Sequence, residues 1–215
     1  MTAANRGEPR QSKDQYPTPV PLARALVATA RQRGWMPRCG RMLEPSAGSG
    51  RFVEHMRAAA PDATLHAVEI DDSLAEHLGS CGANSVVCGS FLTYAAEPYD
   101  FVCGNPPYGV IRRDESGEPV LNRKGNPIVD PVAEDHVRHA LSLLAPGGSL
   151  IFVLRAGFFE AKKHYELVEA EHRPRHILKL NPRPRFFGRG DSTPYFAVLW
   201  TRGWEGTTTT ETYRW

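Results

Sequence analysis

The stretch RMLEPSAGSGRF, residues 41–52, decides the fold. Residues 41–44 are predicted to form a short strand, and residues 51–60 a helix. Between them, Gly48 and Gly50 let a ligand approach the backbone, and the start of the helix presents free N–H groups. A strand, a glycine-rich turn and a helix in this order predict a ligand-binding unit. The turn lacks the complete GxGxxG pattern, so it is weak support alone.

A second strand adds an acidic residue at a suitable place. Residues 63–70 are predicted to form this strand, and Glu69 near its end follows Gly48 by about 20 residues. An acid at this position can bind the ribose hydroxyls of a nucleoside, although it can also cap a helix or face solvent. No lysine follows the glycines, and the phosphate-binding pattern GxxxxGKS/T is missing. The pair therefore favours a nucleoside cofactor over a bound phosphate.

The rest of the chain continues the alternation of strands and helices. This pattern predicts a Rossmann-like α/β fold with a seven-stranded, mostly parallel sheet and helices on both faces. The predicted strands cover residues 41–44, 63–70, 85–88, 99–103, 149–154, 175–180 and 194–201. The predicted helices cover residues 20–35, 51–60, 72–81, 131–144 and 159–172. A loop without a helix joins the last two strands, so the last strand is expected to be antiparallel.

The length of 215 residues fits one domain, which we place at residues 16–203. Residues 1–15 are polar and predicted to be a disordered arm, and residues 204–215 form a C-terminal tail without an assigned role. A long polar loop, residues 106–130, is rich in glycine, proline and charge. Such loops are usually functional lids or are disordered, and we interpret this one as a mobile substrate loop.

Composition limits the class of protein. Apolar residues make up 41% of the chain and charged residues 23%, which is typical of a globular protein. The four cysteines form no CxxC pair and no Cys/His cluster with zinc spacing, so we expect reduced thiols and no metal. The N-terminus lacks the apolar core of a signal peptide, and no apolar run approaches the roughly 18 residues of a membrane span. These features predict a cytoplasmic protein.

The net charge of +2 identifies no partner, but basic residues gather in one segment. Residues 172–190 contain six lysines or arginines and no acid. These are Arg173, Arg175, Lys179, Arg183, Arg185 and Arg189. The segment is a candidate anion-binding patch, and the alternative is a solvated face with scattered counterions.

A second unusual stretch is FVCGNPPYGV, residues 101–110. An apolar strand ends at Gly104 and is followed by Asn105, two prolines and Tyr108. A plain turn needs glycine or asparagine and sometimes one proline, but not this set. The prolines fix the backbone, so Asn105 and Tyr108 are held apart on a stiff support. That arrangement suits binding of a flat polar group, and the alternative is a rigid turn at a strand end.

Taken in order, these motifs resemble the class I S-adenosylmethionine-dependent methyltransferases, and more narrowly the N6-adenine DNA methyltransferases. EPSAGSGRF resembles the cofactor loop of that family, VEID (68–71) its ribose site, and CGSFL (88–92) the segment beside the adenine of the cofactor. NPPY (105–108) resembles the catalytic motif, and YPTP (16–19) the segment that closes over the methionine end. The resemblance spans roughly residues 16–200.

The resemblance implies S-adenosyl-L-methionine as the cofactor and DNA as the partner. The implied cofactor-binding residues are Tyr16, Thr18, Pro19, Glu44, Pro45, Ser46, Ala47, Gly48, Gly50, Glu69, Ile70, Ser90, Phe91 and Asn105. The implied catalytic residues are Asn105, Pro106, Pro107 and Tyr108. Ser90 departs from the family, whose members often have aspartate there, which puts one polar cofactor contact in doubt.

The implied chemistry explains the NPPY stretch. The side-chain oxygen of Asn105 and the carbonyl of Pro106 can accept hydrogen bonds from an exocyclic amine and stabilise its developing positive charge. Tyr108 can stack on the base, which contributes roughly 1–3 kcal/mol. Phe186 is a candidate second wall for the base, with a core position as the alternative.

The chain has no room for a separate target-recognition domain beside the catalytic fold. Sequence specificity is therefore expected to be slight, built from the 106–130 loop and the basic segment, or supplied by a specificity subunit. Within the basic segment, Arg183, Arg185 and Arg189 are the candidate phosphate contacts.

Two other functions fit the same residues. NPPY suits any planar NH₂ group, so an RNA base or a glutamine side-chain amide in a protein are alternative substrates. The basic segment favours nucleic acid over an isolated glutamine. The third reading is a catalytically silent subunit that binds nucleic acid or serves as a scaffold, and the intact NPPY motif argues against it.

Overall fold

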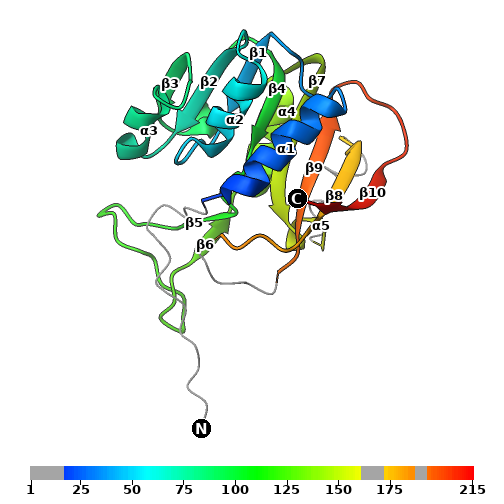
Figure 1. Cartoon of the computed structure of the whole chain (residues 1–215). Coiled ribbons are helices and arrows are strands. Elements are labelled where there is room, and N and C mark those ends of the chain that lie inside the picture. Colours follow the sequence, from blue (N-terminus) through cyan, green and yellow to red (C-terminus); the bar gives the residue numbers. More distant parts are fainter. Residues whose placement is uncertain (1–16, 161–171, 187–192) are drawn as a thin grey trace.

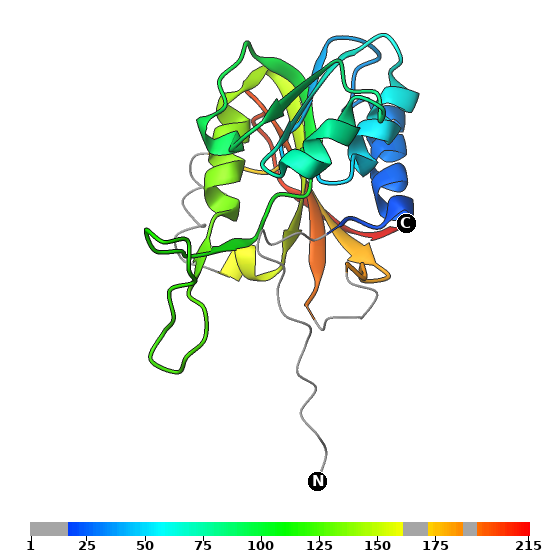
Figure 2. The same cartoon turned by 90° about the vertical axis from the view of Figure 1, so that its left-hand side faces the viewer.

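The computed structural model describes residues 17–160, 172–186 and 193–215. In these residues a central sheet carries helices on both faces (Figures 1 and 2). Its eight strands follow the order β10-β8-β9-β7-β4-β1-β2-β3. Their bounds are β1 Arg41–Glu44, β2 Thr64–Glu69, β3 Ser85–Cys88, β4 Tyr99–Gly104, β7 Leu144–Arg155, β8 His176–Asn181, β9 Tyr195–Thr201 and β10 Thr209–Arg214. The helices are α1 Val20–Gln32, α2 Arg51–Ala59, α3 Asp72–Leu78, α4 Ala133–Ser142, the short α5 Gly157–Glu160 and the 3-10 turn η1 Phe91–Thr93.

Alternate residues of the central strands face two separate cores. On β1, Met42 packs into the core under α1 and α2, and its neighbour Leu43 packs into the core under α4. On β7, Ile151 and Phe152 divide in the same way. Strands buried on both faces are typical of parallel sheets covered by helices. The apolar runs that predicted these strands therefore reflect burial from both sides.

One strand, β9, runs against the others, and it pairs antiparallel with both β7 and β8. The prediction of an antiparallel strand at residues 194–201 is confirmed, as is the Rossmann-like class of the fold. In the described residues the central sheet has eight strands rather than the predicted seven, because residues 209–214 add β10 alongside β8. Since β9 runs in the opposite direction, its first residue lies beside the carboxyl ends of β4, β7 and β8. Tyr195 is paired there with Arg155, the last residue of β7.

The added strand β10 could not be read from its own composition, TTETYR, which is polar. Its attachment comes from contacts with distant residues. The Tyr213 hydroxyl lies 2.7 Å from Thr29 Oγ1 of α1, and Trp215 Nε1 donates to the Pro182 carbonyl at 2.8 Å. Tyr213 and Trp215 also pack against the core under α1. The tail of the sequence therefore closes the edge of the sheet.

The helices begin and end close to the predicted bounds. In α1 the apolar residues repeat at helical spacing and are buried on one face, whereas in α3 the Asp71 side chain caps the N-terminus by accepting from Ser73 N. Of the helix predicted at 159–172, residues 161–171 lie outside the described part. No helix in the described residues is long and apolar enough to cross a membrane.

The loop at 106–130 contains two short strands, β5 (Gly109–Ile111) and β6 (Val129–Pro131), which pair antiparallel. They form the base of an arm that extends away from the body below the sheet edge (Figures 1 and 2). The arm therefore starts at the residue after NPPY and returns directly before α4.

Candidate active site

The glycine-rich turn after β1 crosses the end of β2. Ala47 N donates to the Val68 carbonyl at 3.0 Å, and Gly50 N donates to the Ala47 carbonyl at 2.8 Å. Both glycines have positive φ, 51° at Gly48 and 78° at Gly50. A Cβ at Gly50 would lie 2.5 Å from Cys81 Sγ, whereas one at Gly48 would meet nothing within 4 Å. Gly50 is thus required by packing, and Gly48 borders open space that a ligand can enter.

Glu69 fixes this turn to the end of β2. Its carboxylate accepts from Gly48 N at 2.6 Å through one oxygen and from Asp71 N at 2.8 Å through the other. Each carboxylate oxygen can accept more than one hydrogen bond, so the group can also receive a hydroxyl of a bound nucleoside. Beside it, Ile70 is 59% exposed and offers an apolar surface to a flat ring.

Glu44 connects the turn with the NPPY motif. Its side chain is buried, its Oε1 accepts from Ser46 N at 3.2 Å, and its carboxyl group lies where a Cβ on Gly104 would be. Burial raises the pKa of Glu44 well above its ordinary value, the Ser46 N–H opposes this shift, and the charge of Glu69 adds to it. The last residues of β1 and β4 are therefore in direct contact through one carboxyl group.

In the NPPY motif, Asn105 and Tyr108 contact each other, so the prediction that the prolines hold them apart is wrong. The Tyr108 hydroxyl donates to Asn105 Oδ1 at 2.5 Å and lies 3.4 Å from the Val153 carbonyl. The Tyr108 ring centroid is 6.0 Å from that of Tyr195. In this arrangement the hydroxyl occupies the oxygen of Asn105 that was predicted to accept from a substrate amine.

Arg155 and Tyr195, which the sequence did not indicate as site residues, lie next to Tyr108. The Arg155 guanidinium carbon lies 5.9 Å from the ring centroids of both Tyr108 and Tyr195, and its Nη2 donates to Thr193 Oγ1 at 3.1 Å. Both residues stand where β7 ends and β9 begins. A charged residue directly after the apolar run SLIFVL was the available signal for Arg155, whereas the place of Tyr195 depends on the reversal of β9.

The part of the basic segment that follows β8 lies near the same carboxyl ends of the strands. The centroid of the Phe186 ring lies 4.7 Å from that of Tyr195, and the side chain is buried. Phe186 therefore packs against Tyr195 and is not exposed to solvent. Arg183 and Arg185 are exposed. Arg189 lies outside the described residues, as does Tyr16.

The remaining predicted cofactor residues divide between the turn and the core. The Thr18 carbonyl accepts from the Arg51 guanidinium, which ties the segment before Pro19 to the start of α2. Phe91 is 3% exposed and its ring lies 4.7 Å from that of His139 of α4, so its side chain belongs to the core. Ser90, directly before it, is partly exposed. In the described ranges, no group of three histidine, cysteine or acidic side chains is placed to hold a metal ion.

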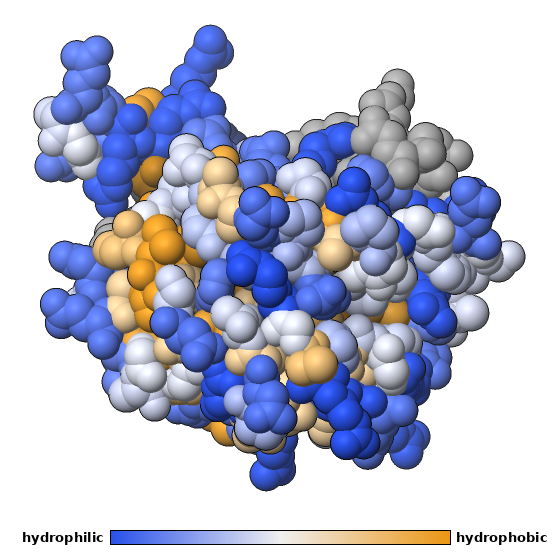
Figure 3. Space-filling view, turned by 90° about the horizontal axis from the view of Figure 1, so that it is seen from above, coloured by the Kyte–Doolittle hydropathy of each residue, from blue (hydrophilic) through white to orange (hydrophobic). Residues whose placement is uncertain are grey.

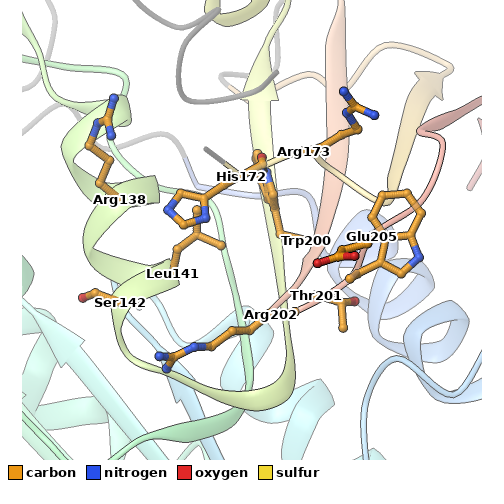
Figure 4. A pocket seen from close by; sticks show the side chains of 11 residues that line it. Arg138, Leu141, Ser142, His172, Arg173, Trp200, Thr201, Arg202 and Glu205 are labelled. Atoms are coloured by element: carbon orange, nitrogen blue, oxygen red, sulfur yellow. Dashed lines mark hydrogen bonds between the residues drawn. The ribbon is translucent and has the colours of Figure 1, made fainter. Parts of the chain in front are cut away.

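A separate hollow of about 470 Å³ lies beside the last residues of β9 and α4, at the other end of the strands (Figure 4). It includes Arg138, Arg173 and Arg202, but their guanidinium groups point in different directions. Because the arginine heads diverge and the hollow is remote from the glycine-rich turn and NPPY, we assign the site to the turn and the motif.

Comparison with known proteins relates the chain to methyltransferases. No protein-family model matches the chain. The Type II methyltransferase M.CvrRI of Paramecium bursaria Chlorella virus XZ-6E is 28% identical over 56% of this chain and 31% of its own length. The Type II methyltransferase M.TthHB8I of Thermus thermophilus is 27% identical over 68% of this chain and 35% of its own length. The chain thus spans about a third of the length of these curated relatives.

Solved structures share the fold. The M protein of the Type I restriction enzyme EcoKI matches with a TM-score of 0.65 and 16% identity over 88% of this chain and 44% of its own. A Listeria monocytogenes protein assigned to the class I S-adenosylmethionine-dependent methyltransferases matches with a TM-score of 0.69 and 15% identity over 94% of this chain and 65% of its own. S-adenosyl-L-methionine is the cofactor that this fold supports. The chain has the class I S-adenosylmethionine-dependent methyltransferase fold and is similar in sequence to Type II methyltransferases.

Proposed function

We propose that the chain is an S-adenosylmethionine-dependent N6-adenine methyltransferase that acts on DNA. The observation that carries this proposal is the contact between Glu44 and Gly104. This contact brings the glycine-rich turn beside the NPPY motif, which supports a site where a cofactor bound at the turn and a flat amine bound at NPPY can meet. Much of the rate enhancement then comes from holding the reacting atoms in line.

The residues around the turn fit the cofactor. Gly48 leaves open space at the turn, the Glu69 carboxylate has lone pairs left for ribose hydroxyls, and exposed Ile70 suits the adenine ring. When bound there, S-adenosyl-L-methionine supplies an electrophilic methyl group on its sulfonium.

Asn105 and Pro106 activate the acceptor. An exocyclic amine is a poor nucleophile because its lone pair is delocalised into the ring. The Asn105 oxygen and the Pro106 carbonyl accept hydrogen bonds from its two N–H groups and stabilise the positive charge that develops on nitrogen. Tyr108 donates to Asn105 Oδ1 in the described structure, and this oxygen has a second lone pair that can accept from the amine. A Tyr108 ring that turns to stack on the base gives up its hydrogen bond to Asn105.

No general base is required before methyl transfer, since the extra proton leaves the nitrogen afterwards. A target inside a duplex must be flipped out of the stack, which costs a few kcal/mol. The resemblance of the motifs to adenine methyltransferases supports DNA as substrate, as do the Type II relatives. The proposal also includes a cytoplasmic location and allows for a separate specificity subunit.

The test uses radiolabelled S-adenosyl-L-methionine with duplex DNA, single-stranded DNA, RNA and a protein extract, followed by digestion of the product. We expect label in N6-methyldeoxyadenosine. Asn105→Ala, as the matched control, should transfer no label while binding the cofactor within a few-fold of the original affinity.

Label in N6-methyladenosine from RNA, or in glutamine, would replace DNA with one of the two alternative substrates. Cofactor binding without label in any pool would favour the catalytically silent subunit.

A further inference from the structure

The arm between β5 and β6, residues 109–131, contains an internal repeat. Residues 114–121 read DESGEPVL and residues 122–129 read NRKGNPIV. In each octapeptide an Asp or Asn is followed by a glycine at the fourth position, a proline at the sixth and two apolar residues. Identical spacing in two consecutive segments predicts two copies of one turn.

The two turns have the same geometry. Asp114 Oδ1 accepts from Ser116 N at 2.9 Å and Glu118 N at 3.0 Å, and Gly117 has a φ of 84°. In the second turn, Asn122 Oδ1 accepts from Lys124 N at 2.9 Å and from Asn126 N at 3.2 Å. Gly125 has a φ of 75° there, in the same left-handed region. Each turn is therefore held by its own first side chain.

Three backbone hydrogen bonds join the arm at one level. Arg112 N donates to the Ile128 carbonyl at 2.9 Å, Ile128 N to the Val120 carbonyl at 2.8 Å, and Val120 N to the Arg112 carbonyl at 2.9 Å. These bonds form a closed ring between the three segments of the arm. The tips of both turns are consequently held in a fixed relation to β5, which begins directly after Tyr108.

The two turns differ in charge. The first carries Asp114, Glu115 and Glu118, and the second carries Arg123 and Lys124. Of the other arm cations, Arg112 forms a bidentate pair with Asp130 and Arg113 donates to the Gly117 carbonyl. Within the described part of the chain, the side chains of Arg123 and Lys124 form no hydrogen bond or ion pair.

The arm stands out from the body and its surface is mostly hydrophilic, as Figure 3 shows at the upper left. Its exposed apolar side chains, Val110, Leu121 and Val129, are separated along the chain by polar residues. The arm thus offers a projecting basic tip rather than an apolar docking face.

We propose that residues 109–131 are a nucleic-acid docking arm whose second turn contacts backbone phosphates of the strand that carries the target base. The inference rests on the proposed function and adds a phosphate subsite to it. A polynucleotide carries a regular series of phosphates, so one ligand can place its target base at NPPY and backbone phosphates at the cations of the second turn, which an isolated amide cannot do. The acidic twin turn repels phosphate and so fixes which way the strand lies.

The test measures DNA affinity at several salt concentrations between about 50 and 200 mM, by fluorescence anisotropy of a labelled duplex with the full chain. The variant is Arg123→Gln with Lys124→Gln. Two lost phosphate contacts should reduce the slope of log affinity against log salt by about 1.8, roughly 0.9 for each contact. Cofactor affinity should be unchanged, which reports that the variant is folded.

The twin turn supplies the control, Glu115→Gln with Glu118→Gln, in the same backbone geometry. This variant should keep or raise the DNA affinity and should not reduce the salt slope. An unchanged slope in the basic-turn variant would overturn the docking arm while leaving the methyltransferase proposal intact. If the unmutated chain bound no DNA at any salt concentration yet held its cofactor, the DNA substrate itself would be wrong.

Discussion

At the scale of single residues, the polar groups of the site already form hydrogen bonds and contacts with one another. Asn105 receives the Tyr108 hydroxyl, Glu69 receives two backbone amides, and Glu44 lies over Gly104. An unpaired polar group in such a half-buried place would cost about 1–3 kcal/mol, so these contacts stabilise the site without a ligand. A substrate amine that binds at Asn105 therefore meets an oxygen that already accepts one hydrogen bond and has a second lone pair to offer.

Two substitutions at Tyr108 separate its hydroxyl from its ring. Tyr108→Phe removes the group that occupies Asn105 Oδ1 and keeps the stacking surface, so KM should stay equal or fall and kcat should remain within a few-fold. Tyr108→Ala removes the surface worth roughly 1–3 kcal/mol, so KM should rise about 5- to 150-fold. Steady-state kinetics on one DNA substrate checks both, and equal losses in the two variants would contradict a stacking role.

A pH dependence follows from Glu44. Because burial raises the pKa of this carboxyl above its ordinary 4.5, the folded chain keeps a proton that the unfolded chain releases. Its contribution to stability is complete below the ordinary value and is lost as pH rises through the raised pKa of the folded state. The Glu44→Gln variant has no carboxyl group to ionise at this position, so it does not lose this stability. Its free energy of unfolding, relative to that of the unmutated chain, should therefore increase as pH rises.

Urea unfolding at a series of pH values measures this difference. The exposed Glu76→Gln serves as the control and should follow the pH dependence of the unmutated chain. Parallel curves for Glu44→Gln and the unmutated chain would mean that the carboxyl does not change its protonation on unfolding.

At the scale of elements, what could be predicted depended on whether a segment carries its own pattern. Residues 150–154 are an uninterrupted apolar run, so the central strand was evident, although β7 begins earlier, at Leu144. Residues 209–214 are polar, and β10 exists because Tyr213 and Trp215 reach partners far along the chain. The site residue Tyr195 was missed although its strand and the direction of that strand were predicted, because the pairing of β9 with β7, which sets Tyr195 opposite Arg155, was not.

The attachment of β10 can be tested at one side chain. Tyr213→Phe loses the hydrogen bond to Thr29 Oγ1, so the free energy of unfolding should fall by about 1 kcal/mol. Glu211→Gln in the same strand breaks an exposed pair with Arg33 and should cost between zero and about 1 kcal/mol, nearer to zero. Chemical denaturation ranks the two, and an equal effect would mean that the strand is held by its backbone pairing alone.

At the scale of the whole molecule, exposed cations flank the site on two sides. The arm follows β4 with Arg123 and Lys124, and the segment after β8 presents Arg183 and Arg185. The NPPY motif and its aromatic neighbours lie at the ends of the strands between them. A strand of nucleic acid that crosses the site can therefore be held on both sides of the target base.

This arrangement predicts additive salt effects. Arg183→Gln with Arg185→Gln should reduce the salt slope of DNA binding by up to about 1.8, and combining it with the arm variant should reduce the slope by the sum. The same anisotropy titration with all four chains checks this expectation. A combined effect no larger than that of either pair would indicate that only one side contacts the strand at a time.

The twin turns of the arm have a consequence for how this protein could change its preferences. Their backbone shape depends on the first side chain and the glycine of each octapeptide, whereas the second position carries Glu115 in one copy and Arg123 in the other. Most of the charge difference between the two turns thus lies at positions that do not set their shape, although the first position, Asp114 or Asn122, contributes to both. The charge of each turn, and with it the preferred ligand, can therefore be changed by substituting a few side chains while the backbone conformation of the arm is kept.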